Sequence, residues 1–63
     1  MPKFDIEVTT EGWGDARFIF VDVEKAIRKA GATSQEVNKW YEEAMAGDYD
    51  HVLRTAMQWV KIA

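Results

Sequence analysis

The side chains best suited to chemistry stand together in the segment GDYDH, Gly47 to His51, which holds two aspartates and the only histidine of the chain. Carboxylate and imidazole groups are metal ligands and general acid-base groups, but a metal site needs several ligands that converge. Asp48, Asp50 and His51 leave the start of one predicted helix in different directions. Aspartate also suits a helix start, because its carboxylate caps free backbone N–H groups. The segment therefore predicts a helix cap and no metal site.

Basic residues form the second candidate group. Lys25, Arg28 and Lys29 share one helix face through their i, i+3 and i+4 spacing, and Arg54 is a further cation that would lie nearby. Supplied by adjacent subunits, these side chains would hold the phosphates of an anionic nucleotide while an aromatic ring stacks on its base. An ordinary solvated face explains the same residues, because Glu24 precedes Arg28 at ion-pair spacing and cations favour the last turn of a helix. Both interpretations stay open, and the solvated face is favoured.

Residues for catalysis are scarce. The chain has no cysteine, one histidine and no glycine-rich loop with the spacing of a phosphate-binding motif. Its carboxylates follow no pattern that predicts a pair in a cleft. We therefore expect a protein that is not an enzyme and needs no cofactor.

The stretch EGWGDAR, Glu11 to Arg17, places Trp13 between two glycines. Tryptophan is enriched among the residues that dominate binding energies, so the ring is a candidate anchor for a protein partner. The flanking glycines would equally let it fold back as a lid on a small core. Phe18 and Trp59 are further candidate partner-binding residues, because both remain after one apolar face of each predicted element has been used.

Length and composition limit the classes of protein. Sixty-three residues make a single domain, 1–63, and an apolar content of 48% argues against disorder. The net charge of −3 disfavours direct DNA binding, although carboxylates gathered on one face would make a weak acidic decoy of nucleic acid. The start MPKFD lacks the pattern of a secretory signal, and no apolar run approaches the ~20 residues of a membrane span. We expect a cytoplasmic protein without membrane contact.

The order of the predicted elements indicates an α+β fold, with a short antiparallel sheet or hairpin packed on two to three helices. Residues 3–10 alternate apolar and polar side chains, as a half-buried strand does. Residues 18–21 are four consecutive apolar residues, which one helix face cannot hold. We therefore favour an extended segment over about 17–20 that pairs with the first strand, rather than a helix. Residues 59–62 also alternate, and they either end the last helix or add a strand against the first one.

Helices are predicted at about 21–30, 34–46 and 49–59. Gly31 is expected to end the first helix in a left-handed conformation, and Gly47 to end the second. Thr33 and Glu36 have the spacing of a capping box at the start of the second helix.

The expected core leaves several apolar residues without a place. Its members come from the apolar faces of the predicted elements: Phe4, Ile6, Val8, Phe20, Val23, Ile27, Trp40, Met45, Leu53, Met57 and Val60. Trp13, Phe18, Ile19 and Trp59 remain. A homodimer or higher oligomer that buries these residues is therefore predicted.

The run GDYDHVLRTAMQWV and the preceding RKAGATSQEVNKWYEEAMA give the chain a resemblance to a known group. It resembles small uncharacterised bacteriophage-encoded proteins that share an N-terminal strand, a helix ending in an Ala-Gly turn, an acidic second helix and a C-terminal GDYDHxLxTAMxWV pattern. The resemblance implies work in the host cytoplasm by stoichiometric binding, either against a host or defence protein or by sequestering a signalling nucleotide. It carries no catalytic motif.

Overall fold

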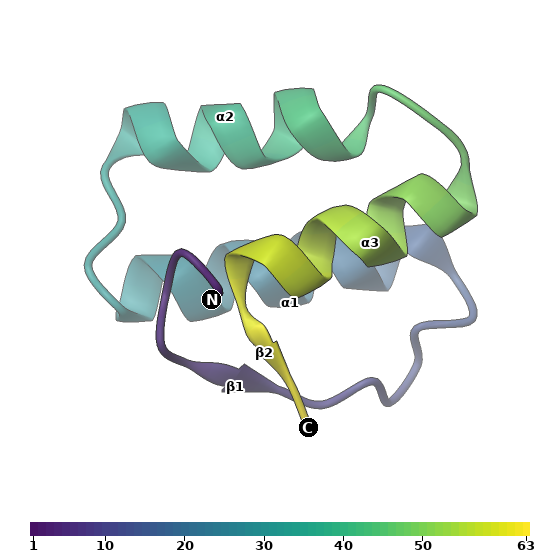
Figure 1. Cartoon of the computed structure of the whole chain (residues 1–63), viewed down its shortest axis with the longest axis horizontal. Coiled ribbons are helices and arrows are strands. Elements are labelled where there is room, and N and C mark those ends of the chain that lie inside the picture. The colour runs from purple at the N-terminus through teal and green to yellow at the C-terminus, as the bar shows by residue number, and fades with distance from the viewer.

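Three helices and two very short strands make up the protein in a computed structural model that describes all 63 residues. Their bounds, in chain order, are β1 (Glu7–Val8), α1 (Ala16–Lys29), α2 (Ser34–Ala44), α3 (Tyr49–Trp59) and β2 (Lys61–Ile62). Figure 1 shows α1 and α3 in a middle tier, with α2 on one side and the strand pair on the other. The fold is thus mostly helical, with a minimal sheet. No helix is both long and apolar enough to span a lipid bilayer.

The sheet is parallel, so the predicted antiparallel sheet or hairpin is wrong. Glu7 pairs with Lys61 and Val8 with Ile62. The physical reason is that β1 finds its partner after three helices instead of across a tight turn, and a long crossover connection allows the parallel direction that a hairpin turn cannot. The strand predicted within 59–62 is present as β2, beside β1.

Only part of the predicted first strand, 3–10, forms ladder bonds. The N–H groups of Lys3 and Phe4 instead donate to the carbonyls of Gln58 and Trp59, each at 2.9 Å. These carbonyls belong to the last turn of α3, where no intrahelical donor is left for them. The N-terminal segment therefore serves as the C-terminal cap of α3 before it becomes a strand.

The extended segment predicted at 17–20 is helix, which corrects that prediction. Helix α1 begins at Ala16, because the Asp15 side chain accepts a hydrogen bond from the Arg17 N–H at 2.9 Å and caps the free donors of the first turn. The four consecutive apolar residues are divided by the helix: Ile19 is buried, Phe20 is half-buried, and Phe18 and Val21 stay at the surface.

Capping signals in the sequence are confirmed at the end of α1 and at the starts of α2 and α3, whereas the expected Gly47 cap of α2 is wrong, because Met45 is the C-cap and Gly47 does not have a positive φ. Gly31 has φ of +100° directly after α1, and the Ala32 N–H reaches the Ile27 carbonyl at 2.8 Å, as in a Schellman motif. The capping box of α2 is complete, since Thr33 Oγ1 accepts from the Glu36 N–H at 3.1 Å and Glu36 Oε1 accepts from the Thr33 N–H at 2.8 Å. Helix α3 has the predicted bounds, whereas α2 ends at Ala44, two residues before the predicted end at 46.

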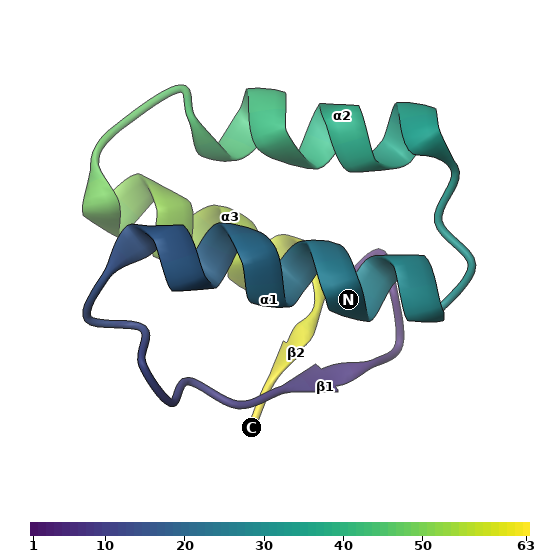
Figure 2. The same ribbon diagram turned by 180° about the vertical axis from the view of Figure 1, so that it is seen from behind.

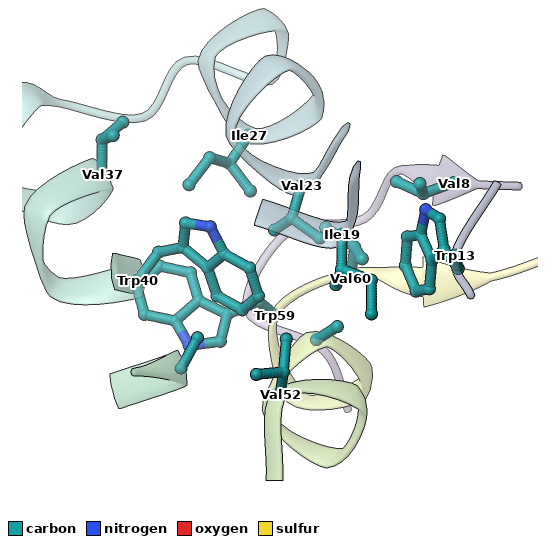
Figure 3. Packing of buried hydrophobic residues seen from close by; sticks show 12 residues of the cluster. Val8, Trp13, Ile19, Val23, Ile27, Val37, Trp40, Val52, Trp59 and Val60 are labelled. Atoms are coloured by element: carbon teal, nitrogen blue, oxygen red, sulfur yellow. The ribbon is translucent and has the colours of Figure 1, made fainter. Parts of the chain in front are cut away.

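The core is one cluster of buried hydrophobic residues contributed by every helix and both ends of the chain (Figure 3). Trp40 and Trp59 meet edge to face at its centre, with ring centroids 6.1 Å apart. Met45 and Met57, expected in the core, are 68% and 62% exposed. Met45 lies beyond the end of α2 at Ala44, and Met57 lies off the buried face of α3, which is formed by Val52, Thr55, Ala56 and Trp59. The radius of gyration of 10.3 Å matches the roughly 10.6 Å expected for a folded domain of 63 residues.

Candidate protein-binding surface

Trp13 belongs to the core and not to a binding loop. Its ring is 3% exposed and lies beside Val8 (Figure 3). The Nε1–H donates to Asp22 Oδ2 at 2.9 Å, and the Tyr49 hydroxyl donates to the Trp13 carbonyl. Gly12, at φ of +82°, makes the turn that folds the ring inward. The sequence left open whether Trp13 is a partner anchor or a lid on the core. In the structure the ring covers the core.

Trp59 is also occupied within the chain. Its ring is 1% exposed, stacks on Phe4 with centroids 6.0 Å apart, and is covered by the Lys3 Nζ at 4.1 Å from the ring centroid. The Nε1–H donates to Glu43 Oε1 at 2.9 Å. Trp13, Ile19 and Trp59 are thus all buried within one chain. The prediction of self-association assumed that these residues had no place in the core, and that assumption is wrong. Neither tryptophan presents its ring to a partner in this conformation.

Phe18 alone of the three predicted partner-binding residues lies at the surface. Its side chain is 53% exposed, and that of Val21, one turn further along α1, is 42% exposed. The i, i+3 spacing places them side by side on the outer face of the helix. Val21 was missed as a candidate because the predicted helix began at about residue 21 and therefore did not place Val21 one turn beyond Phe18; the run of four apolar residues was the signal.

The four predicted ligand-binding cations do not converge within one chain. Arg28 Nε is committed to Glu24 Oε2 at 2.8 Å, which is the ordinary surface pair that the spacing suggested. Lys25 and Lys29 border a hollow between α1 and β1. Arg54 borders a different hollow beside α3, where the Lys3 ammonium is already paired with Glu43 at 3.7 Å.

Charge is unevenly divided along the chain. Residues Ala16–Lys29 of α1 contain four cations and two carboxylates, a net +2, whereas the other 49 residues contain four cations and nine carboxylates, a net −5. Phe18 and Val21 therefore lie on the positive element of an acidic protein. A partner surface that is negative around an apolar centre would complement this helix.

The hollow beside α1 has a volume of 380 Å³. One wall is the extended segment from Ile6 to Thr9, and the other is the α1 face that carries Asp22, Lys25, Ala26 and Lys29. Figure 2 shows α1 in front, with β1 running below it. The hollow is wide open to solvent and is a shallow groove rather than an enclosed pocket.

Another hollow, of 290 Å³ and lined mostly by apolar residues, lies where α1 meets the turn between α2 and α3. Met45 and Tyr49 border it, and no lysine or arginine does. The Tyr49 hydroxyl is engaged by the Trp13 carbonyl. This hollow is the competing candidate for a contact surface.

The predicted helix cap at GDYDH is confirmed. Asp48 Oδ1 accepts from the His51 N–H at 3.0 Å, and the His51 Nε2 lies 2.7 Å from the Glu43 carbonyl oxygen. A Cβ on Gly47 would lie 2.7 Å from the His51 Cβ, so glycine makes room for the ring. The histidine thus ties the start of α3 to the end of α2.

Ionisation is perturbed in ion pairs and in one hydrogen-bonded tyrosine. The Tyr41 hydroxyl donates to Glu24 Oε1 and holds the pKa of that carboxyl below its ordinary value, with Arg28 assisting. Burial of Tyr41, together with this hydrogen bond, raises its pKa to about 12. Tyr41 stacks on Phe20 with ring planes 4° apart, so the group joins α1 to α2 as a structural contact.

The carboxylates considered for a nucleic-acid decoy are divided between opposite sides of the molecule. Glu42 and Glu43 lie on α2, whereas Asp5 and Glu7 lie with the strands beyond the middle tier (Figure 1). Asp5 is paired with Lys61 at 2.7 Å. This division does not favour a decoy.

No protein-family model, curated protein or solved structure matches the chain.

Proposed function

We propose that the chain is a small non-enzymatic binding module that acts stoichiometrically on a host or defence protein through the outer face of α1. The observation that carries the proposal is the exposure of Phe18 and Val21, at 53% and 42%, on adjacent turns of the helix that holds the chain's surplus of positive charge.

The pair has the form of a helix-borne contact site. Large apolar side chains left in water are favourable to bury, at about 25 cal/mol per Å² of apolar surface, and aromatic residues are enriched at the centre of interfaces. Lys25 follows Val21 by one helical turn and makes no salt bridge in the chain, so it supplies a charged rim to an apolar centre.

The test is capture of host proteins by the immobilised chain and by matched variants. Phe18→Ser and Val21→Ser are expected to lose the specific partner, whereas Met57→Ser, which also removes an exposed apolar side chain, retains it. Circular dichroism checks that each variant is folded. A partner retained by both α1 variants, or lost with Met45→Ser at the competing hollow, would refute the assignment to α1.

A homo-oligomer that sequesters an anionic nucleotide is the second candidate. It is favoured by Lys25, Lys29 and Arg54, which form no salt bridge in the single chain. Adjacent subunits would have to bring these cations together, since one chain keeps Arg54 apart from the other two. Light scattering with calorimetry against a panel of cyclic and linear nucleotides tests it, and a monomer that gives no binding heat would remove it.

A further inference from the structure

The outer edge of β1 is open. β1 pairs only with β2, and the carbonyls of Ile6 and Val8 accept from the N–H groups of Lys61 and Ala63, each at 2.9 Å. Backbone groups of successive strand residues point to opposite edges. The N–H and C=O of Glu7 therefore point away from β2, and an edge of this kind is a template for another strand.

The hollow of 380 Å³ runs along this open edge. Four successive residues, Ile6 to Thr9, border the hollow, so residues of both faces of the strand contribute to its lining. A hollow beneath a sheet is lined by residues of one strand face only, because alternate residues point to opposite faces. A hollow along a strand edge is lined by residues of both faces. The hollow is thus placed where an added strand would lie, between residues of β1 and residues of α1. Figure 2 shows these two elements, with α1 in front and β1 below it.

The helix wall of the hollow is basic. Lys25 and Lys29 follow one another by a helical turn, are exposed and form no salt bridge in the chain. Two carboxylates also border the hollow. Asp22 accepts the Trp13 Nε1–H at 2.9 Å, and Glu7 alternates with the buried Val8 and so faces solvent.

We propose that the groove between β1 and α1 binds an extended acidic peptide segment of the partner protein, which adds as a strand to the open edge of β1 while Lys25 and Lys29 bind its carboxylates. Backbone hydrogen bonds to Glu7 supply the strand pairing, and the two ammonium groups select the charge. The inference rests on the proposed function, because it states how the partner is held beside Phe18 and Val21.

A second copy of this chain fits the groove less well. Two β1 edges paired about a two-fold axis are antiparallel, and each brings its own α1 wall to the same groove. Lys25 and Lys29 of both copies would then face each other, and like charges in close contact oppose association. An acidic segment from another protein meets the same lysines with the opposite charge.

The probe is a synthetic peptide of alternating valine and glutamate, with both ends blocked, followed by amide NMR spectra of the intact chain. We expect shift changes concentrated at Glu7, Thr9, Lys25 and Lys29, and slowed exchange of the Glu7 amide. The matched peptide with lysine in place of glutamate is expected to bind at least tenfold more weakly. A peptide with alternate backbone amides methylated keeps the charge but cannot pair as a strand, and should lose binding.

Charge variants of the chain complete the test. Lys25→Glu with Lys29→Glu should abolish binding, and Lys25→Gln with Lys29→Gln should weaken it, whereas Lys39→Glu on α2 leaves it unchanged. Equal binding of the lysine peptide, undiminished binding of the methylated peptide, or no shift change at millimolar peptide would overturn the inference. If partner capture still depends on Phe18 while the peptide does not bind, the groove inference alone fails. If the peptide binds but no Phe18-dependent partner exists, the proposed function alone fails.

Discussion

Replacing Trp13 by alanine distinguishes a core residue from a surface anchor. An anchor could be truncated without loss of folding, whereas a ring that is 3% exposed cannot. Truncation of a buried tryptophan to alanine costs about 3–5 kcal/mol, from lost burial and the cavity that remains. The Asp22 carboxylate also loses the hydrogen bond that the Trp13 Nε1–H donates to it at 2.9 Å.

The magnitude decides the outcome, because the chain is small. At roughly 0.05–0.15 kcal/mol per residue, 63 residues give a total stability of about 3–9 kcal/mol. Trp13→Ala is therefore expected to remove between about a third and all of the free energy of unfolding. It should lower Tm by at least about 12 °C, at roughly 4 °C per kcal/mol. Many molecules would be unfolded at room temperature if the parent chain lies at the lower end of that range.

Thermal and urea unfolding followed by circular dichroism measure this effect. Phe18→Ala is the matched control, because it removes an aromatic ring that is 53% exposed and is expected to cost under about 1 kcal/mol. If Trp13→Ala unfolds within about 1 kcal/mol of the parent chain, the ring does not support the core and the reasoning above is refuted.

Two further predictions concern contacts that join the helices. Gly47→Ala should destabilise the chain by about 1–3 kcal/mol in urea unfolding, because the added Cβ would lie 2.7 Å from the His51 Cβ. Gly14→Ala is the control and should be neutral or slightly stabilising, because an added Cβ there has nothing within 4 Å. Equal effects of the two substitutions would contradict the crowding at Gly47. The lowered pKa of Glu24 adds stability that is complete above the ordinary pKa of glutamate and is lost as the pH falls through the lowered value. In Tyr41→Phe an NMR titration should show the Glu24 pKa moving back toward its ordinary value, and an unchanged titration would show that the hydroxyl is not the cause.

Helix boundaries set by local chemistry could be predicted from the sequence. The Thr33 and Glu36 box, the Gly31 end and the Asp48 cap each act within a few residues of the backbone groups they satisfy, and all three are present. The extended interpretation of 17–20 failed because four consecutive apolar residues do not fit one helix face, and the Asp15 cap, which is an equally local signal, was overlooked.

Features that depend on distant partners could not be predicted. The parallel pairing of Val8 with Ile62 joins opposite ends of the chain, and neither segment carries a signal of its partner's direction. The position of Trp13 depends on Asp22 and Tyr49, which meet it only when α1 and α3 are in place. The candidate surface was predicted in part: Phe18 was named, but the open edge of β1 follows from the sheet topology alone.

The pairing of the N-terminal segment with residues 58–63 also sets a time for folding during synthesis. The N–H groups of Lys3 and Phe4 and the carbonyl of Ile6 find their partners at Gln58, Trp59 and Lys61. Those residues leave the ribosome more than fifty positions after the first segment does. The three helices can begin to form on the nascent chain, but its first strand has no neighbour until residue 61 has left the exit tunnel. The pairing of β1 with β2 therefore forms only after the residues of all three helices have been synthesised, and it cannot guide the first steps of helix formation.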